Sequence, residues 1–229
     1  MTIKEQNDSK LIITLMEKLA RIHAMEVPIK KSRDWILDYF DDCFDLANER
    51  FDVKDLIEKS QSLTLLKFDL GEEIQWLKTA IKGIDSPKVF SHNDFRGCNV
   101  MITETDGILL CDFEVSCYGF RGFDFGAFFI EWDRSWGDWD MTVEFPSDET
   151  LKPFINAYIE ESVKLKGKAF IEDERNSLQH ILKEVKVLSL AELMFLIVLF
   201  LQLQDSFING IPLDKIKTMV RHKIFLKNN

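Results

Sequence analysis

A chain of 229 residues can bury a core large enough for one domain, and this one carries 39 acidic against 29 basic residues. Its net charge of -10 and the lack of any Lys/Arg-rich block argue against a nucleic-acid partner. The four cysteines show neither metal-site spacing nor disulfide-framework density, and the polar N-terminus lacks a signal-peptide core, so we expect reduced thiols and a cytoplasmic location.

Apolar residues recur at helical spacing in three segments before the centre of the chain. The predicted helices cover Asp8 or Ser9 to Ile22, residues 32–47 and residues 65–81. A lone histidine, His23, sits on the continuation of the first helix, and we expect it to be a packed or capping group rather than a catalytic one. Gly83 and Pro87 then interrupt the helical pattern, so a different kind of structure is predicted after them.

The central stretch predicts a small β-hairpin. Two apolar runs flank Asp106-Gly107, a dipeptide typical of hairpin turns. The predicted strands cover residues 100–102 and 108–111. A further apolar run at residues 88–90 leads into the polar loop that precedes the hairpin.

Four oxygen-bearing side chains flank this hairpin in the sequence. Asp94 lies in the loop before it, Asn99 immediately precedes the first strand, and Asp112 and Glu114 end the second. Because residues two apart in an extended chain point to the same side, we expect the carboxylates of Asp112 and Glu114 both to face the loop. The hairpin would then bring all four side chains to one end.

This set of side chains suits phosphoryl transfer. Mg²⁺ prefers oxygen ligands and completes its shell with substrate phosphates, while one Asp accepts the proton of the attacking hydroxyl. Asp94 suits the base, with Asn99, Asp112 and Glu114 as metal ligands. The alternative is structural: Asp94 and Asn99 would cap a turn, and residues 112–114 would be an exposed strand end.

The motif H-N-D-x4-N, followed by D-F-E and then Y-G-F-R-G-F-D-F-G-x-F-F-x-E-W, resembles the choline/ethanolamine kinases. It includes the H-x-D-x4-N motif of aminoglycoside-phosphotransferase-type enzymes. The resemblance implies an α+β fold, the mainly helical C-terminal lobe of a protein-kinase-like fold, with a small hairpin carrying the site. It also implies that Asp94 is the catalytic base, that Asn99 and Asp112 bind metal, and that Glu114 binds metal or substrate.

The same resemblance implies that His92, Arg121 and Asp124 are structural supports. Asp124 would open a helix over Asp124–Glu131 and cap it through its side chain. These three residues are therefore expected to hold the site in place without reacting.

Aromatic residues are expected to wall a pocket for an ammonium group, because aromatic faces attract cations. In the choline kinases an aromatic residue shortly after the E-W pair helps to line the choline pocket, and Trp136 is expected there, with plain packing as the alternative. Phe195 and Val198 occupy the positions of a tryptophan pair that lines this pocket in that family, and Phe195 is therefore also expected to bind the substrate. The replacement favours ethanolamine or another small amino alcohol over choline.

The C-terminal third predicts three more helices. They cover residues 146–167, residues 173–204 and a last segment from Pro212. The second contains an apolar run from Leu193 to Leu201, flanked by Glu192 and Gln202, which is much shorter than the about 20 residues of a membrane span. We therefore expect a buried helix and no membrane span.

Neither G-x-G-x-x-G nor G-x4-G-K-[ST] occurs in the 229 residues, although transfer of phosphate from ATP normally uses a glycine-rich loop and a lysine. We therefore expect residues 1–229 to form only the C-terminal lobe, with the N-terminal nucleotide lobe absent.

The leading hypothesis is an ATP- and Mg²⁺-dependent kinase of a small amino alcohol, ethanolamine or choline, in phospholipid head-group synthesis. One alternative is a non-catalytic lobe that binds the amino alcohol or pairs with a full-length kinase subunit, in a homo- or heterodimer. A phosphotransferase for aminoglycosides or other small molecules is disfavoured by the R-G-F-D and E-W motifs.

Overall fold

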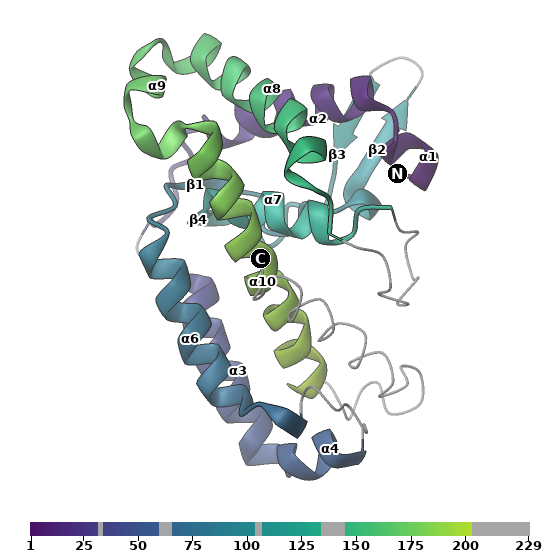
Figure 1. Cartoon of the computed structure of the whole chain (residues 1–229), viewed down its shortest axis with the longest axis vertical. Coiled ribbons are helices and arrows are strands. Elements are labelled where there is room, and N and C mark those ends of the chain that lie inside the picture. The colour runs from purple at the N-terminus through teal and green to yellow at the C-terminus, as the bar shows by residue number, and fades with distance from the viewer. Residues whose placement is uncertain (32–33, 60–65, 104–106, 134–144, 203–229) are drawn as a thin grey trace.

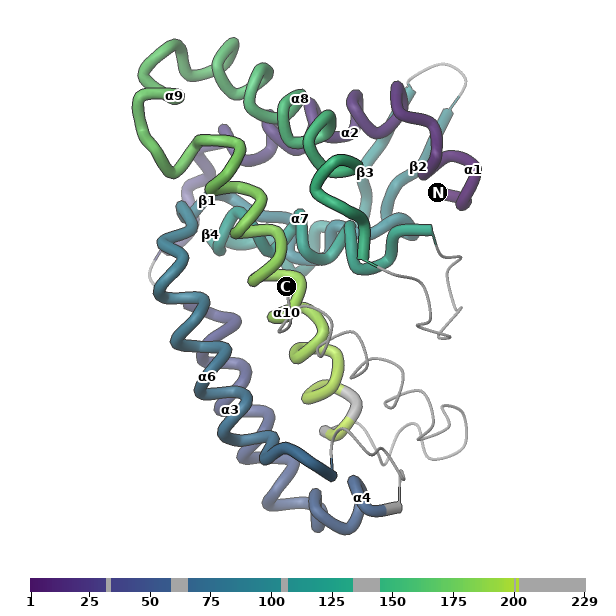
Figure 2. The backbone as a smooth tube through the Cα atoms, viewed as in Figure 1, coloured from purple at the N-terminus to yellow at the C-terminus, as the bar shows by residue number. Residues whose placement is uncertain are grey.

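The computed structural model describes residues 1–31, 34–59, 66–103, 107–133 and 145–202 (Figures 1 and 2). It is a mainly helical α+β fold with two small strand pairs, which confirms the predicted fold class. The helices are α1 (Ile3–Gln6), α2 (Ser9–His23), α3 (Trp35–Arg50), α4 (Val53–Lys59), α6 (Leu70–Gly83), α7 (Arg121–Ile130), α8 (Asp148–Lys166), α9 (Ala169–Glu172) and α10 (Leu178–Gln202). The strands are β1 (Lys88–Ser91), β2 (Val100–Thr103), β3 (Gly107–Leu110) and β4 (Cys117–Phe120), and the 3-10 turns are η1 (Gly97–Asn99) and η2 (Glu174–Asn176).

Side-chain caps determine where the main helices begin. Asp8, Asp69 and Ser147 each accept hydrogen bonds from backbone N–H groups in the first turns of α2, α6 and α8. The helical pattern is interrupted at Phe68 and Asp69, so α6 begins later than the apolar spacing predicted. α10 likewise begins at Leu178, because the preceding residues form the separate turn η2.

The strands form two antiparallel pairs. β2 pairs with β3, which confirms the predicted hairpin. β1 pairs with β4, a strand that the sequence pattern did not indicate, with Ser91 opposite Cys117 and Lys88 opposite Phe120. The loop after β1 and the segment before β4 therefore leave the same end of this pair.

Two glycines bring α10 into close contact with α7. A Cβ atom added at Gly122 would lie 2.9 Å from the Cβ of Glu184, and one at Gly126 would lie 2.6 Å from the backbone nitrogen of Ser189. Larger side chains would hold the helix axes further apart. Beyond this crossing α10 continues along α3 and α6, which lie side by side (Figures 1 and 2).

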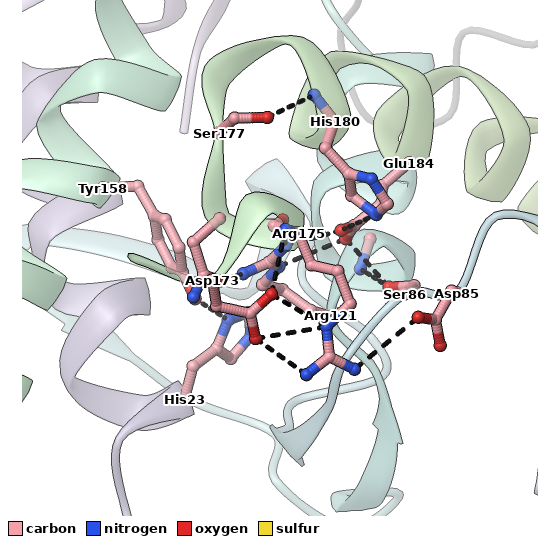
Figure 3. A network of polar contacts seen from close by, with 12 residues as sticks. His23, Asp85, Ser86, Arg121, Tyr158, Asp173, Arg175, Ser177, His180 and Glu184 are labelled. Atoms are coloured by element: carbon pink, nitrogen blue, oxygen red, sulfur yellow. Dashed lines mark hydrogen bonds and ion pairs between the residues drawn. The ribbon is translucent and has the colours of Figure 1, made fainter. Parts of the chain in front are cut away.

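A buried ion pair fixes the same crossing (Figure 3). The guanidinium of Arg121 donates to Glu184 Oε1 at 2.5 Å and to Oε2 at 3.1 Å, and these two side chains are 1% and 0% exposed. It also donates to Asn176 Oδ1 at 2.5 Å and to the Arg175 carbonyl at 2.7 Å. Ser86 donates to Glu184 at 2.8 Å. These extra hydrogen bonds offset the cost of burying both charges, and they join α7 to α10, η2 and the segment before β1.

The main core joins apolar side chains of α2, α3, α6, α7, α8 and α10. The predicted buried run of α10 lies largely inside it, and no helix among the described residues is long and apolar enough to cross a membrane. All four cysteines are free, as predicted. The helix predicted from Pro212 lies outside the described residues.

The contact between α7 and α10 predicts a marked difference between two glycine substitutions. Gly126→Ala should lower the free energy of unfolding by about 1–3 kcal/mol, because the new methyl group would meet backbone atoms of Leu188 and Ser189 that cannot rotate away. Gly83→Ala is the control, since nothing lies within 4 Å of its added Cβ, and it should be neutral or stabilising by about 0.5–1 kcal/mol. Urea denaturation measures both. Equal stabilities would contradict the close crossing.

Candidate functional site

The loop after β1 is held by one buried carboxylate, that of Asp124. Its Oδ2 accepts the backbone N–H of His92 at 2.8 Å, and its Oδ1 accepts that of Asn93 at 2.7 Å. Oδ2 also lies 3.0 Å from Nε2 of His23 on α2. The predicted capping role of Asp124 is wrong, because α7 already begins at Arg121 and the carboxylate of Asp124 is directed to the loop instead.

The protonation states in this contact follow from its geometry. Burial opposes ionisation of Asp124, but hydrogen bonds from His23 and from the two loop amides outweigh it and lower the pKa of Asp124. Burial lowers the pKa of His23, which is neutral at pH 7. Nε2–H of His23 therefore donates to Asp124, and Nδ1 accepts the hydroxyl of Tyr158 at 3.0 Å. His23 is a packed residue, as predicted.

The segment before β4 closes over the loop from the other side. Asn93 has a φ of 62°, a left-handed conformation that costs a non-glycine residue of order 1 kcal/mol. Its side-chain amide donates to the Val115 carbonyl at 3.1 Å and to Cys117 Sγ at 3.2 Å. Ser116 donates to the His92 carbonyl at 3.1 Å. Together with Asp124, these contacts hold the backbone of residues 92–94 in one conformation.

Asp94 extends from this loop into a group of charged residues. Arg96 donates to it through Nε at 2.5 Å and through Nη2 at 3.3 Å, and Asn99 Nδ2 donates to Oδ2 at 2.7 Å. Arg96 also donates to Glu131, just after α7, at 3.3 Å. Burial disfavours the cation, but Asp94 and Glu131 outweigh it and raise the pKa of Arg96. The sequence motif gave no reason to single out Arg96, since that position is variable in H-x-D-x4-N.

Asp112 and Glu114 lie in an irregular, exposed segment. β3 ends at Leu110 and Asp112 has a φ of 66°, so the alternation expected of an extended chain does not apply here and that prediction is wrong. Within the described ranges no three His, Cys, Asp or Glu side chains form a group that could hold a metal ion. The metal-binding roles of Asn99, Asp112 and Glu114 stay predictions.

The backbone just before Asp112 is nevertheless tied to the loop. The carbonyl of Cys111 accepts Nε2–H of His92 at 2.9 Å, and the N–H of Cys111 donates to the Asn99 carbonyl at 3.1 Å. Nδ1 of His92 in turn accepts the N–H of Asp94 at 3.3 Å. His92 therefore connects the residue that carries the proposed base to the segment that carries Asp112.

Four aromatic residues from three helices form a cluster around Phe195. Its ring centroid lies 4.7 Å from that of Tyr39, 6.0 Å from that of Trp35 and 6.4 Å from that of Phe123. Tyr39 and Trp35 come from α3, Phe123 from α7 and Phe195 from α10, and all but Phe123 are partly exposed. We call these four residues the aromatic cluster.

The aromatic cluster borders the loop that carries Asp94. A Cβ atom at Gly119 would lie 3.1 Å from Nε1 of Trp35 and 3.0 Å from Oδ1 of Asn93, so both side chains meet at this glycine. Trp136, the other aromatic residue predicted to bind substrate, lies outside the described residues. The substrate-binding role of Phe195 stays a prediction that its position allows.

Glu192 lies one turn before Phe195 on α10. It is 3% exposed, and its Oε2 has no hydrogen-bond partner in the part of the chain that the structure describes. Burial raises its pKa to about 8; Arg96 opposes this shift, while Asp94 and Glu131 add to it. In the sequence, the available indication that Glu192 belongs to the site was its place as an acidic residue at the edge of an apolar run.

Comparison with known proteins gives a family and a fold. The family model for choline/ethanolamine kinases matches residues 1–219. A choline/ethanolamine kinase of Rattus norvegicus is 30% identical over 186 residues, which cover 75% of this chain and 45% of the relative. A choline/ethanolamine kinase of Homo sapiens is 28% identical over 207 residues, which cover 84% of this chain and 50% of the relative. The chain thus spans about half the length of the curated relatives it matches.

Two solved structures resemble the chain over nearly its whole length. An ethanolamine kinase of Plasmodium vivax has a TM-score of 0.70 and 21% sequence identity. The match covers 98% of this chain and 61% of that kinase. A choline kinase of Cryptosporidium parvum has a TM-score of 0.70 at 17% identity, with 67% of it and 100% of this chain covered. At these identities the likeness shows the fold.

Asp124→Asn should lower the free energy of unfolding by about 2–5 kcal/mol, because the amide nitrogen of asparagine cannot accept a hydrogen bond, and each buried donor left without an acceptor costs about 1–3 kcal/mol. Asp69→Asn makes the same chemical change at the exposed cap of α6, where asparagine caps as well as aspartate, and should be nearly neutral. Urea denaturation compares the two variants. An Asp124→Asn protein as stable as the Asp69→Asn control would show that the buried carboxylate does not hold the loop.

Proposed function

The chain belongs to the choline/ethanolamine kinase family, and we propose that it supplies the substrate-activating part of an ATP- and Mg²⁺-dependent kinase of a small amino alcohol. The observation that carries the proposal is the fixed geometry of Asp94. Its loop is held by Asp124 and its carboxylate by Arg96 and Asn99. Residues 1–229 are then the C-terminal lobe of such a kinase.

Asp94 has room to accept one more hydrogen bond. An ionised carboxylate offers about four lone-pair sites, and the side chains of Arg96 and Asn99 reach three of them. The remaining site can receive the hydroxyl of the substrate. In phosphoryl transfer the Asp mainly positions this hydroxyl and takes its proton late, so the neighbouring charge of Arg96 is compatible with the role.

The oxygen donors near Asp94 fit Mg²⁺, which is usually held by one or two carboxylates together with water and substrate phosphates. Because Nδ2 of Asn99 donates to Asp94, its Oδ1, which also accepts the thiol of Cys98 at 3.5 Å, is the atom that could bind a cation. Asp112 and Glu114 are exposed carboxylates on the segment bonded to the same loop. These three residues would hold the ion, which when bound neutralises the charge of the phosphates.

The glycine-rich loop that normally holds the β- and γ-phosphates of ATP does not occur in these 229 residues. The surface beside Asp112 is suited to receive another protein segment. Met101 and Leu109 pair across β2 and β3 and are 48% and 39% exposed, and Phe113 and Val115 are 41% and 50% exposed. Exposed apolar side chains on the β2–β3 hairpin and on the segment just after it could bury themselves against such a segment.

The metal proposal predicts weak Mn²⁺ binding that depends on Asp112. Without nucleotide the affinity should be millimolar or weaker, because few protein ligands are available. Paramagnetic broadening of amide signals should centre on residues 98–114 and be largely lost in Asp112→Asn. Asp45→Asn, on the exposed face of α3, should leave it unchanged. Identical broadening in the Asp112→Asn variant would remove Asp112 from the ligand set.

The kinase proposal is tested by measuring phosphoethanolamine and phosphocholine formation from ATP and Mg²⁺. The chain alone should show no turnover, because positioning of the phosphates, which can supply about 7–11 kcal/mol of barrier reduction, is missing. Mixed with a separately expressed N-terminal lobe of a related kinase, it should turn over, and Asp94→Asn should abolish that activity.

Two outcomes would decide against this account. Turnover by the chain alone that is lost in Asp94→Asn would show that no further lobe is needed. Binding of ethanolamine without turnover in any mixture would support the alternative, a non-catalytic lobe that binds amino alcohol or pairs with a kinase subunit.

A further inference from the structure

Glu192 is a buried carboxyl group that the proposed chemistry at Asp94 does not use. It is 3% exposed and lies within the main core segment of α10, between Ala191 and Leu193, which are 0% and 2% exposed. No hydrogen bond or ion pair to its side chain is found in the described ranges, and its Oε2 is fully covered. Burying a polar group without a partner costs about 1–3 kcal/mol, so an unpartnered carboxyl beside a candidate site calls for a ligand.

Charged groups on the loop after β1 and at α7 influence the pKa of Glu192. The loop after β1 contributes Asp94 and Arg96, α7 contributes Asp124, and Glu131 comes directly after α7. On α3, Tyr39 is affected by the charge of Glu192. Glu192 is therefore within electrostatic range of the proposed base, and it lies one helical turn from Phe195, whose ring is 4.7 Å from that of Tyr39 in the aromatic cluster.

Of the carboxylates in this group, Glu192 is the one available for a cation. Asp94 and Glu131 are bonded to Arg96, and Asp124 is bonded to His23 and the loop amides. With Glu192 protonated, Asp94, Glu131 and Arg96 leave one net negative charge. If a monocation replaces the proton of Glu192, the net charge is unchanged.

The surroundings favour an organic ammonium over a metal ion. A divalent metal would need several oxygen ligands, whereas the other carboxylates in this group are already bonded to Arg96, to His23 or to the loop amides. The aromatic rings of Tyr39 and Phe195 lie 4.7 Å apart, with Phe195 one turn from Glu192. Aromatic faces and a carboxylate together suit an ammonium head group.

We propose that the carboxylate of Glu192 binds the ammonium group of the substrate and selects a primary amine over a quaternary one. The inference rests on the proposed function, because it takes Asp94 as the group that receives the hydroxyl of the same molecule. A primary ammonium donates up to three hydrogen bonds, whereas a trimethylammonium donates none. Only the primary ammonium can donate hydrogen bonds to the buried carboxylate while it also contacts the neighbouring aromatic rings.

Binding exchanges a proton for the ammonium ion: the protonated carboxyl of Glu192 releases its proton to solvent, and the resulting carboxylate receives the N–H groups of the ligand. Calorimetry of ethanolamine binding at pH 7, in two buffers of different ionisation enthalpy, should therefore detect release of about one proton per ligand. The affinity for ethanolamine should rise as the pH increases toward 8, because a smaller fraction of Glu192 then carries the proton that the ligand must displace. Choline should bind more weakly and release fewer protons.

Glu192→Gln keeps the size of the side chain and removes its charge. It should weaken ethanolamine binding by about 10- to 100-fold, the loss of one charged hydrogen bond, and abolish proton release while changing choline binding little. Glu160→Gln on the exposed face of α8 is the matched control and should leave both ligands unaffected. The proton count on the unaltered chain gives a readout that does not depend on the variant folding.

The two proposals fail in different ways. If ethanolamine binds the unaltered chain without proton release, and equally well in Glu192→Gln, the role of Glu192 is overturned while the amino alcohol site stands. If the folded chain binds neither ethanolamine nor choline, the proposed function itself fails. A preference for choline that is unchanged in Glu192→Gln would also overturn the selection of a primary amine.

Discussion

The structure of the candidate site depends on the buried carboxylate of Asp124. It accepts two backbone N–H groups of the loop after β1 and the imidazole of His23, and so joins α2, α7 and the loop at one point. A loop amide without such an acceptor would be a buried unpaired donor, and Asn93 would have no reason to hold a positive φ. The position of Asp94 follows directly, because it is the next residue in the chain.

α7 transmits the same constraint to α10. Arg121 binds Glu184 at one end of the crossing, and Gly126 meets the backbone at Ser189 further along. The register of α10 against α7 is fixed by both contacts, and with it the positions of Glu192 and Phe195. Packing of backbone on backbone thus brings a buried carboxyl and an aromatic ring from the C-terminal helix toward a loop nearly 100 residues earlier in the chain.

The sequence predicted the features that depend on local pattern. The Asp-Gly hairpin, the helical spacing and the family motif all depend on neighbouring residues, and the hairpin and fold class are confirmed. β4 was missed because it pairs with β1 across more than 20 residues. The capping role of Asp124 was wrong because a carboxylate in a first turn can equally well bind a distant loop. Arg96 and Glu192 gave no periodic signal, since their significance lies in which charges surround them in space.

Native-state hydrogen exchange of the His92 and Asn93 amides tests most directly whether Asp124 holds the loop. If it does, both amides should exchange only when the whole domain unfolds, with an opening free energy equal to the global value from urea denaturation. Amides of the exposed segment 112–115 should exchange much faster and serve as the internal comparison. Exchange of His92 and Asn93 as fast as that segment would show that the loop opens on its own, and would contradict the central place given to Asp124.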